Sequence, residues 1–174
     1  MYKEEEEFHT FRGYTQAQFE RNKLSASMED YLEMIYRLAA DEDFTRVNDV
    51  AGALNVQPPS VTRMIQRLAA RDLLEYERYG VIVLTEEGRE VGRYLLQRHN
   101  MLEEFFTRLG VRSRLLENVE RIEHNLTPEA VKCLSMLVAF LRDNPEIQQL
   151  ISDYQSERYA SDESDLTPGS SHSQ

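Results

Sequence analysis

The sequence has little cysteine and no long apolar run, and each absence excludes a class of protein. One cysteine, Cys133, stands among 174 residues, so no disulfide can form within the chain. No apolar run approaches the ~20 residues that a membrane-spanning helix needs. The first ten residues, "MYKEEEEFHT", lack the apolar stretch of a secretory signal. These features predict a protein of the reducing cytoplasm without a membrane partner.

Basic residues are also few, because 20 Lys and Arg face 31 Asp and Glu for a net charge of −11. Such a charge argues against non-specific binding to nucleic acid. It does not exclude a local basic surface, and it overstates the repulsion if some acids neutralise a bound cation. The length and the 41% hydrophobic content suit one ordinary domain or two small lobes that share a core.

Composition and periodicity divide the chain into four parts. We expect an acidic N-terminal extension over residues 1–24 and a serine-rich, disordered tail over residues 156–174. Between them lies a helical pattern with one strand-like interruption, which predicts a first domain over residues 25–92 and a second over residues 93–155.

The first domain has the element order of a winged helix-turn-helix. A helix is predicted after Ser27 as N-cap, with Asp30 in the position of a capping-box acid. A second helix follows Thr45, and the short turn "NVQPPS" leads into a third. The stretch "LLEYERYGVIVL" then reads as a small hairpin that turns at Gly80. Helix, helix, short turn, helix and hairpin together predict a winged DNA-binding fold.

The second domain is expected to be all helical. Thr85 is placed to begin a long helix that runs to about Arg108, where Gly110 ends it, and a further helix is expected over residues 112–125. The helix after Thr127 is apolar on nearly every side, which so short a chain cannot easily cover. It is either central to the fold or an oligomer interface, and a dimer interface is favoured because the apolar face needs a partner. The sequence therefore predicts a mainly α protein with a winged helix-turn-helix DNA-binding domain followed by an all-helical dimerisation domain.

The third helix carries the features of a recognition helix. From Gln57 to Arg71 the chain has three arginines and no acid, a local charge of +3. Hydroxyl and amide side chains reach base edges and phosphates, and arginines contact phosphates or guanine. A helical hairpin with a solvated polar face is the alternative. The residues expected to contact DNA are Gln57, Ser60, Thr62, Arg63, Gln66, Arg67 and, on the wing, Arg78.

The stretch "VERIEHNL" places Glu120, Glu123 and His124 on one face of a helix beside its apolar side. Asp30 and Glu33 repeat the arrangement on the first helix. Alone, charged residues at this spacing are usually a solvated face.

His99 is the third part of the pattern. It falls on the inner stripe of the long helix, where a single histidine is more often a core residue than a metal ligand. The combination changes the interpretation, because four buried carboxylates need counter-charge and two divalent cations would supply it. The candidate ligands contain no sulfur, which suits manganese or ferrous iron.

Five segments carry a family resemblance: "SMEDYLEMIY", "VQPPSVTRMIQRL", "YERYGVIVLTEEG", "QRHNMLEEF" and "VERIEHNL". Together they span most of residues 25–145, and their joint order is highly specific. With them the sequence resembles the diphtheria-toxin-repressor family of metal-dependent regulators, in its manganese transport regulator branch. Pro59 and Asn125 depart from the family pattern, which more often has serine and histidine at these two positions.

The resemblance implies a homodimeric repressor of metal-uptake genes that binds palindromic operator DNA when metal is bound. It implies two Mn2+ per subunit, with Fe2+ as the alternative metal and an iron-responsive repressor as the alternative function. The iron-responsive branch has methionine in place of Asp30 and cysteine in place of Glu120, which favours manganese. The implied ligands are Asp30, Glu120, Glu123 and His124 for one ion and Glu33 and His99 for the other, with Glu120 and Glu123 bridging.

Two other functions fit parts of the pattern. Carboxylate-bridged metals activate water in binuclear metallohydrolases, but the sequence shows no separate nucleophile or oxyanion arrangement. A winged-helix protein whose acidic cluster is a salt-bridge network without metal is the other alternative.

Overall fold

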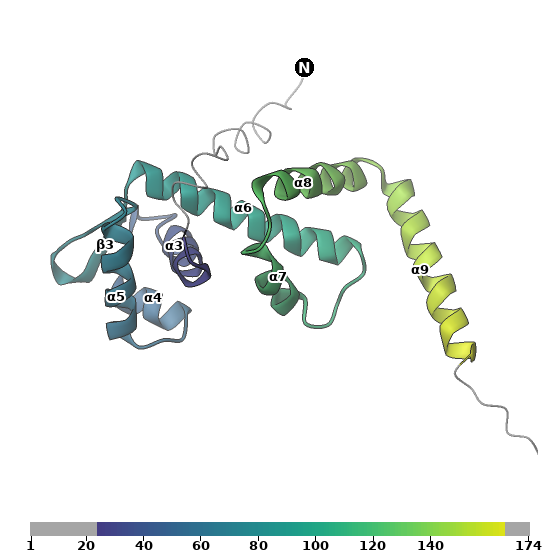
Figure 1. Cartoon of the computed structure of the whole chain (residues 1–174), viewed down its shortest axis with the longest axis horizontal. Coiled ribbons are helices and arrows are strands. Elements are labelled where there is room, and N and C mark those ends of the chain that lie inside the picture. The colour runs from purple at the N-terminus through teal and green to yellow at the C-terminus, as the bar shows by residue number, and fades with distance from the viewer. Residues whose placement is uncertain (1–23, 166–174) are drawn as a thin grey trace, which may run out of the picture.

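The computed structural model describes residues 24–165, which form an N-terminal half and a C-terminal half joined by one long helix (Figure 1). The N-terminal half consists of α3 (Ala26–Leu38), β1 (Phe44–Arg46), α4 (Val47–Ala53), α5 (Pro58–Ala69), β2 (Leu74–Tyr76), η1 (Arg78–Gly80) and β3 (Val81–Leu84). The long helix α6 (Glu86–Arg108) leads to the C-terminal half, which consists of α7 (Leu115–Glu123), α8 (Pro128–Asp143) and α9 (Pro145–Asp165). The architecture is mainly helical, as the sequence predicted.

The wing is a three-stranded antiparallel sheet in the order β1-β3-β2. The sequence predicted only the hairpin of β2 and β3, and it did not predict the strand β1 before α4. In β1, Thr45 is 4% exposed and lies opposite Ile82. A strand of three residues is too short to show the alternation that identifies strands in a sequence.

The core of the N-terminal half follows the predicted helical periodicity. Ile35 of α3, Ile65 of α5 and Ile82 of β3 are fully buried in one apolar cluster. The predicted periodic positions of α5 are therefore its core face, and its polar residues are left for the outside.

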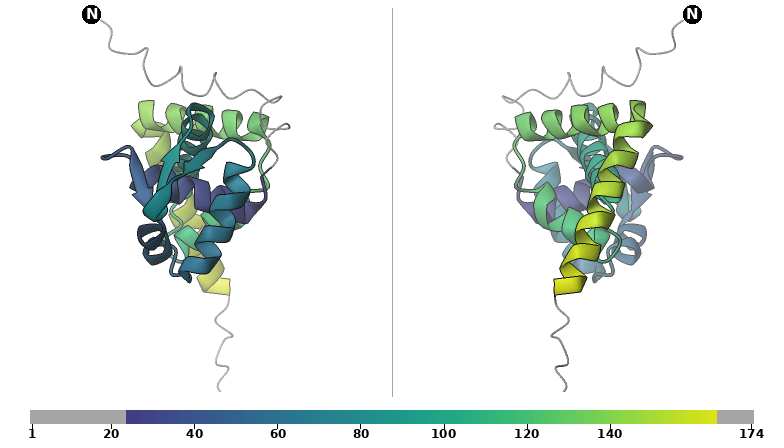
Figure 2. Two further views of the ribbon diagram at one scale, coloured as in Figure 1. Left: turned by 90° about the vertical axis from the view of Figure 1, so that its left-hand side faces the viewer. Right: turned by 90° about the vertical axis from the view of Figure 1, so that its right-hand side faces the viewer.

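Helix α6 separates two layers of helices (Figures 1 and 2). α3 and α7 pack on one side of it, and α8 packs on the other. Val119 of α7 and Val131 and Val138 of α8 close a second, smaller core with the C-terminal half of α6. The opposite face of α8 leaves apolar side chains exposed at Met136, Leu137 and Phe140.

Two sequence predictions about helix ends need correction. The N-cap of α3 is Ser25 instead of Ser27, and its carbonyl oxygen accepts from the amides of Met28 and Glu29. Asp30 therefore has no capping function and is available to the neighbouring helices. At the other end of the chain, α9 continues to Asp165, so the predicted disorder is wrong for residues 156–165.

The side-chain amide of Gln148 anchors α9 by donating to the carbonyl of Arg108, and that of Gln155 does the same to Leu109. The extension over residues 1–23 and the last nine residues, 166–174, lie outside the described part of the chain. None of the helices between residues 24 and 165 has the length and hydropathy of a membrane span.

The junction between the wing and α6 depends on a close backbone approach at Gly88. Thr85 caps α6 by accepting from the Gly88 amide at 3.0 Å, and its hydroxyl donates to the carbonyl of Asp72. A Cβ at Gly88 would lie 1.7 Å from the carbonyl oxygen of Leu73. That contact is with main chain, so no side-chain movement relieves it.

We therefore expect Gly88→Ala to lower the free energy of unfolding by at least about 2 kcal/mol, since the main chain must shift to accept the methyl group. Gly52→Ala is the matched control, because nothing lies within 4 Å of a Cβ on this helical residue. Its unfolding free energy should stay equal or rise by up to about 1 kcal/mol, the helix propensity difference. Chemical denaturation of both variants measures the effect, and equal stabilities would contradict it.

Candidate metal centre and DNA-binding surface

Acidic and imidazole side chains from three helices, α3, α6 and α7, converge in one place. Asp30 and Glu33 lie about one turn apart on α3, His99 lies on α6, and Glu123 and His124 are the last residue and the C-cap of α7. Five of the six candidate ligands predicted from the sequence are thus brought together, in two groups.

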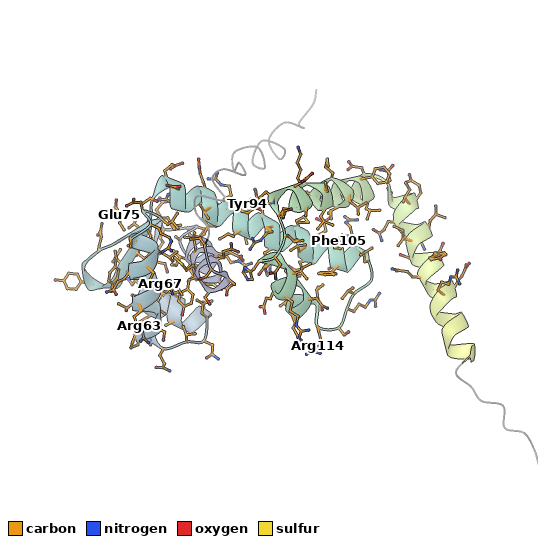
Figure 3. The ribbon with its side chains drawn as sticks, viewed as in Figure 1. Arg63, Arg67, Glu75, Tyr94, Phe105 and Arg114 are labelled. Atoms are coloured by element: carbon orange, nitrogen blue, oxygen red, sulfur yellow. The ribbon has the colours of Figure 1, made fainter. Side chains whose placement is uncertain are left out.

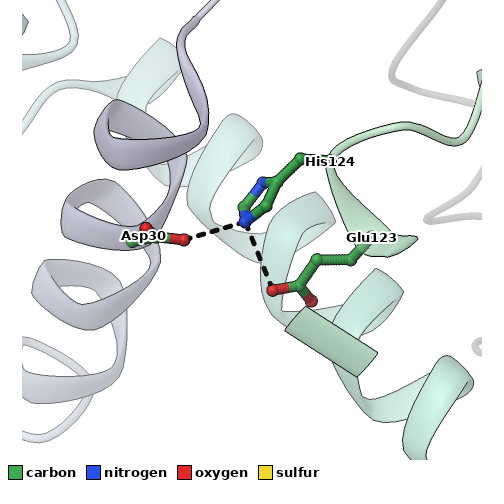
Figure 4. Close-up of side chains that lie close together, drawn as sticks. All are labelled: Asp30, Glu123 and His124. Atoms are coloured by element: carbon green, nitrogen blue, oxygen red, sulfur yellow. Dashed lines mark ion pairs between the residues drawn. The ribbon is translucent and has the colours of Figure 1, made fainter. Parts of the chain in front are cut away.

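The first group consists of Asp30, Glu123 and His124. The Nε2 atom of His124 lies 3.0 Å from Asp30 Oδ1 and 3.6 Å from Glu123 Oε1. Figure 4 shows the imidazole between the two carboxylates, one from each side of the gap between the helices. One ligand atom from each of the three residues lies within 4.8 Å of the others.

The second group consists of Glu33, His99 and Glu123. The Nδ1 atom of His99 lies 3.0 Å from Glu123 Oε2 and 4.0 Å from Glu33 Oε1. Glu123 therefore belongs to both groups, and its two carboxylate oxygens face different histidines. The residue is 3% exposed.

Glu120 stands apart from both groups. It lies on α7 one turn before Glu123 and is exposed. The described structure does not bring it together with the other five candidates. Its assignment as a bridging ligand stays a prediction from the family resemblance.

A buried ion pair that was not predicted from the sequence lies behind His124. Arg98 is 1% exposed, and its Nη2 donates to Glu29 Oε2 at 2.7 Å. The same oxygen of Glu29 lies 2.8 Å from His124 Nδ1. Glu29 thus holds one ring nitrogen of His124 and leaves the other facing Asp30 and Glu123, which is how a second layer of groups orients a ligating imidazole.

A signal for Arg98 was present in the sequence. Arg98 falls three residues after Leu95 and four before Leu102, on the buried stripe of α6, and it directly precedes His99. An arginine at a core position requires a buried acid as partner.

The carboxylates raise the proton affinity of both imidazoles. Hydrogen bonds to Asp30 and then to Glu29 raise the pKa of His124 to about 10. The hydrogen bond to Glu123 raises the pKa of His99. Burial raises the pKa of Glu33, although the neighbouring guanidinium of Arg37 opposes the shift. Without a cation, the protonated imidazole of His124 therefore supplies part of the positive charge that these acids need.

The predicted DNA-contacting residues of α5 lie at the end of the molecule opposite α9 (Figure 3). Gln57, Arg63, Gln66 and Arg67 are exposed, whereas Ser60 and Thr62 are half-buried. The Thr62 hydroxyl donates to the carbonyl of Pro58 at 3.1 Å. A hollow in this surface is lined by Pro58, Pro59, Thr62, Arg63 and Gln66.

Arg78, predicted to contact DNA from the wing, begins η1, but its side chain lies outside the described residues. Tyr79 beside it has a positive φ of 64° and is 92% exposed, so the wing ends in an exposed aromatic ring. The backbone thus places Arg78 at the turn of the wing.

Comparison with known proteins connects the two surfaces. The family described as "Iron dependent repressor, N-terminal DNA binding domain" matches residues 23–82. A second, "Iron dependent repressor, metal binding and dimerisation domain", matches residues 85–151. The two matches meet at the start of α6.

Two relatives are similar in sequence over most of their length. The HTH-type transcriptional regulator MntR of Lysinibacillus sphaericus (strain C3-41) is 43% identical over 122 residues, which cover 70% of this chain and 88% of that protein. MntR of Geobacillus kaustophilus (strain HTA426) is 40% identical over 130 residues, which cover 74% and 92%.

Solved structures agree in fold. IdeR of T. acidophilum is 31% identical with a TM-score of 0.52, over 61% of this chain and 51% of that one. The manganese regulator SloR is 25% identical with a TM-score of 0.57, over 65% and 54%. The chain spans about half the length of these two solved proteins.

These similarities decide between the functions considered from the sequence. The matched domains bind DNA and metal and form dimers, and the relatives are transcriptional regulators, so the metallohydrolase alternative is set aside. The winged helix lies in the matched DNA-binding domain. Glu123, His124 and the apolar face of α8 lie in the matched metal-binding and dimerisation domain. The chain belongs to the iron-dependent repressor family of metal-responsive transcriptional regulators, which is also called the diphtheria-toxin-repressor family.

Proposed function

We propose that this protein is a manganese-responsive repressor of metal-uptake genes, which binds a palindromic operator as a homodimer when Mn2+ is bound. It works in the cytoplasm, where its DNA is. Two ions would be held per subunit, one by Asp30, Glu123 and His124 and the other by Glu33, His99 and Glu123. The family pattern alone would add Glu120 to these ligands. The names of the MntR relatives support manganese.

The observation that carries the proposal is the position of the Glu123 carboxylate. It is 3% exposed, and the partners of its two oxygens are the ring nitrogens of His99 and His124. A carboxylate whose oxygens serve two separate groups is arranged as a bridge. The donors are carboxylate oxygens and imidazole nitrogens without sulfur, which fit manganese or, as the alternative, ferrous iron.

The ligands connect the two halves of the protein. Asp30 and Glu33 belong to α3, which packs against α5 in the DNA-binding domain. Glu123 and His124 end α7 in the dimerisation domain. A bound divalent cation supplies the charge that balances these carboxylates. With that balance, the side chains hold α3 against α7 and fix the orientation of α5 relative to the dimer.

The exposed apolar face of α8 is the surface through which two chains associate. Met136, Leu137 and Phe140 are each more than 40% exposed, so a partner would remove substantial apolar area from water. In the dimer two copies of α5 face successive major grooves, about 34–36 Å apart, which is one turn of DNA.

The first test is DNA binding with and without manganese. We expect the parent protein to bind a palindromic operator at least about ten-fold more tightly with Mn2+, the usual size of an allosteric coupling. Glu123→Gln should remove this difference, since the variant loses the carboxylate common to both groups. Fluorescence anisotropy across a manganese, iron and zinc series measures both effects.

Glu117→Gln is the matched control for that experiment. Glu117 lies on the same helix and pairs with Arg114 and Arg121, away from both groups. Its response to Mn2+ should equal that of the parent. Equal DNA affinity of the parent protein with and without metal would refute the proposal.

A second prediction concerns the recognition helix. Arg63→Ala should weaken DNA binding by about 1–3 kcal/mol in the presence of Mn2+, because an exposed arginine of α5 loses its phosphate or guanine contact. Manganese binding should stay unchanged, since Arg63 lies outside both groups. Arg112→Ala, which removes an exposed arginine before α7, should leave DNA affinity unaltered. Loss of affinity in the control alone would place the DNA surface elsewhere.

A third prediction follows from the raised pKa of His124, about 10 against an ordinary 6.5. Near neutral pH the metal-free imidazole is protonated, whereas a ligating imidazole is neutral, so binding must release a proton. Affinity for Mn2+ should therefore rise with pH until about pH 10. Calorimetry in two buffers of different ionisation enthalpy counts the protons, and an enthalpy independent of buffer would contradict this.

The same shift has the opposite effect on the metal-free fold. The unfolded chain has the lower pKa, so the protonated His124 stabilises the folded state fully below pH 6.5, and this contribution disappears as pH rises toward about 10. His124→Gln should make the melting temperature of the metal-free protein less dependent on pH across this range. A parent protein whose metal-free melting temperature rises over the same range would contradict it.

A further inference from the structure

A cation that belongs to the chain already occupies part of the second group. Arg37 lies on α3 one turn after Glu33, and its Nη2 is 2.6 Å from Glu33 Oε1. That oxygen is also the one nearest to His99, at 4.0 Å from Nδ1. The oxygen of Glu33 that would complete the second group is thus paired with a guanidinium.

We propose that Arg37 competes with the second metal ion for Glu33, so that the group of Glu33, His99 and Glu123 fills after the group of Asp30, Glu123 and His124 and more weakly. This inference rests on the proposed function, because it assumes that both groups bind metal. Arg37 would thus set the Mn2+ concentration at which the second ion binds.

The two groups differ in this respect. Within the described residues, Asp30 and Glu123 form no ion pair with a lysine or arginine, and their charged partners are histidines. Arg98 lies near the first group but pairs with Glu29, which is in neither group. Arg98 approaches only the Nδ1 side of His124, the ring nitrogen opposite the one that faces Asp30. Among the side chains that the structure describes, no guanidinium therefore engages a ligand atom of the first group.

The two arginines also differ in their freedom to move. The side chain of Arg98 is 1% exposed, whereas that of Arg37 is 36% exposed. Arg98 cannot leave without an uncompensated buried charge. Arg37 can withdraw its guanidinium into water, and an ion pair between helix neighbours at this spacing is weak. Arg37 is thus a counter-ion that a divalent cation can displace, and Arg98 is a permanent one.

The size of the effect follows from the charges. A single positive charge about 5 Å from a divalent ion, in surroundings close to water in dielectric strength, weakens binding by about ten-fold. Screening by salt reduces this factor where the guanidinium turns outward. The competition therefore separates the two binding steps without abolishing the second.

The test is a titration of the metal-free, full-length protein with Mn2+, in which electron paramagnetic resonance measures the free ion. The parent protein should bind a first equivalent tightly and a second more weakly. Arg37→Met and Arg37→Gln should tighten the second step by about ten-fold, because both remove the charge, and leave the first within about two-fold. Arg37→Lys keeps the charge and should stay closer to the parent. Thermal melting of each metal-free variant checks that it is folded.

Arg89→Met is the matched control. Arg89 also lies on a helix, and its partly exposed guanidinium pairs with Asp43 at 3.0 Å, away from both groups. The variant should titrate like the parent. A double-mutant cycle adds a second check, because Arg37→Met should tighten the second step less in a Glu33→Gln background than in the parent if Arg37 acts in part by occupying Glu33.

The outcomes separate this inference from the proposed function. A parent protein that binds no Mn2+ would refute the proposed function itself. A parent that binds two equivalents, with the second unchanged in both Arg37→Met and Arg37→Gln, would overturn the competition alone. A weaker second step in these variants would also overturn it, since Arg37 would then support the ligand. One equivalent in the parent and two in the variants would support it.

Discussion

The arrangement of the two domains depends on the carboxylate of Glu123. Its side chain is 3% exposed at the end of α7, where it meets α6 through His99 and lies beside α3. An ionised carboxylate at such depth is costly unless positive charge accompanies it. The protonated imidazole of His124 provides part of that charge in the metal-free protein, and the hydrogen bond to Glu123 raises the pKa of His99. A cation that replaces the proton of His124 is consequently coupled to the arrangement of α3 and α7.

The surrounding charges form a fixed part and a movable part. Glu29 and Arg98 are both buried and hold the His124 ring in one orientation, which makes them a permanent support. Removal of either partner would leave a buried charge uncompensated. Arg37 stands at the other end of the same cluster on an exposed side chain. A centre built in this way keeps its geometry while its charge changes, as a sensor of a cation requires.

Regular patterns in the sequence predicted the parts of the structure that local spacing determines. The helical period gave the buried face of α5, and the spacing of Glu123 and His124 placed them at one end of α7. The division of the ligands into two groups came from the family resemblance and not from local spacing, because it depends on where α6 crosses α7. β1 was missed because three residues show no period. α9 was missed because it is polar and is held by the amides of Gln148 and Gln155 instead of an apolar stripe.

An acidic protein that binds DNA must separate its charges in space. The chain carries a net −11, yet α5 contains no acid and exposes Arg63 and Arg67 at the end opposite α9. The buried acids are instead gathered where imidazoles or cations neutralise them, so they contribute little field at α5. Coupling between the two sites therefore does not need long-range attraction. It needs only that α3, which carries Asp30 and packs against α5, has a preferred position when the carboxylates are balanced. Linkage then requires that DNA, by favouring the same position, strengthen metal binding by the same factor.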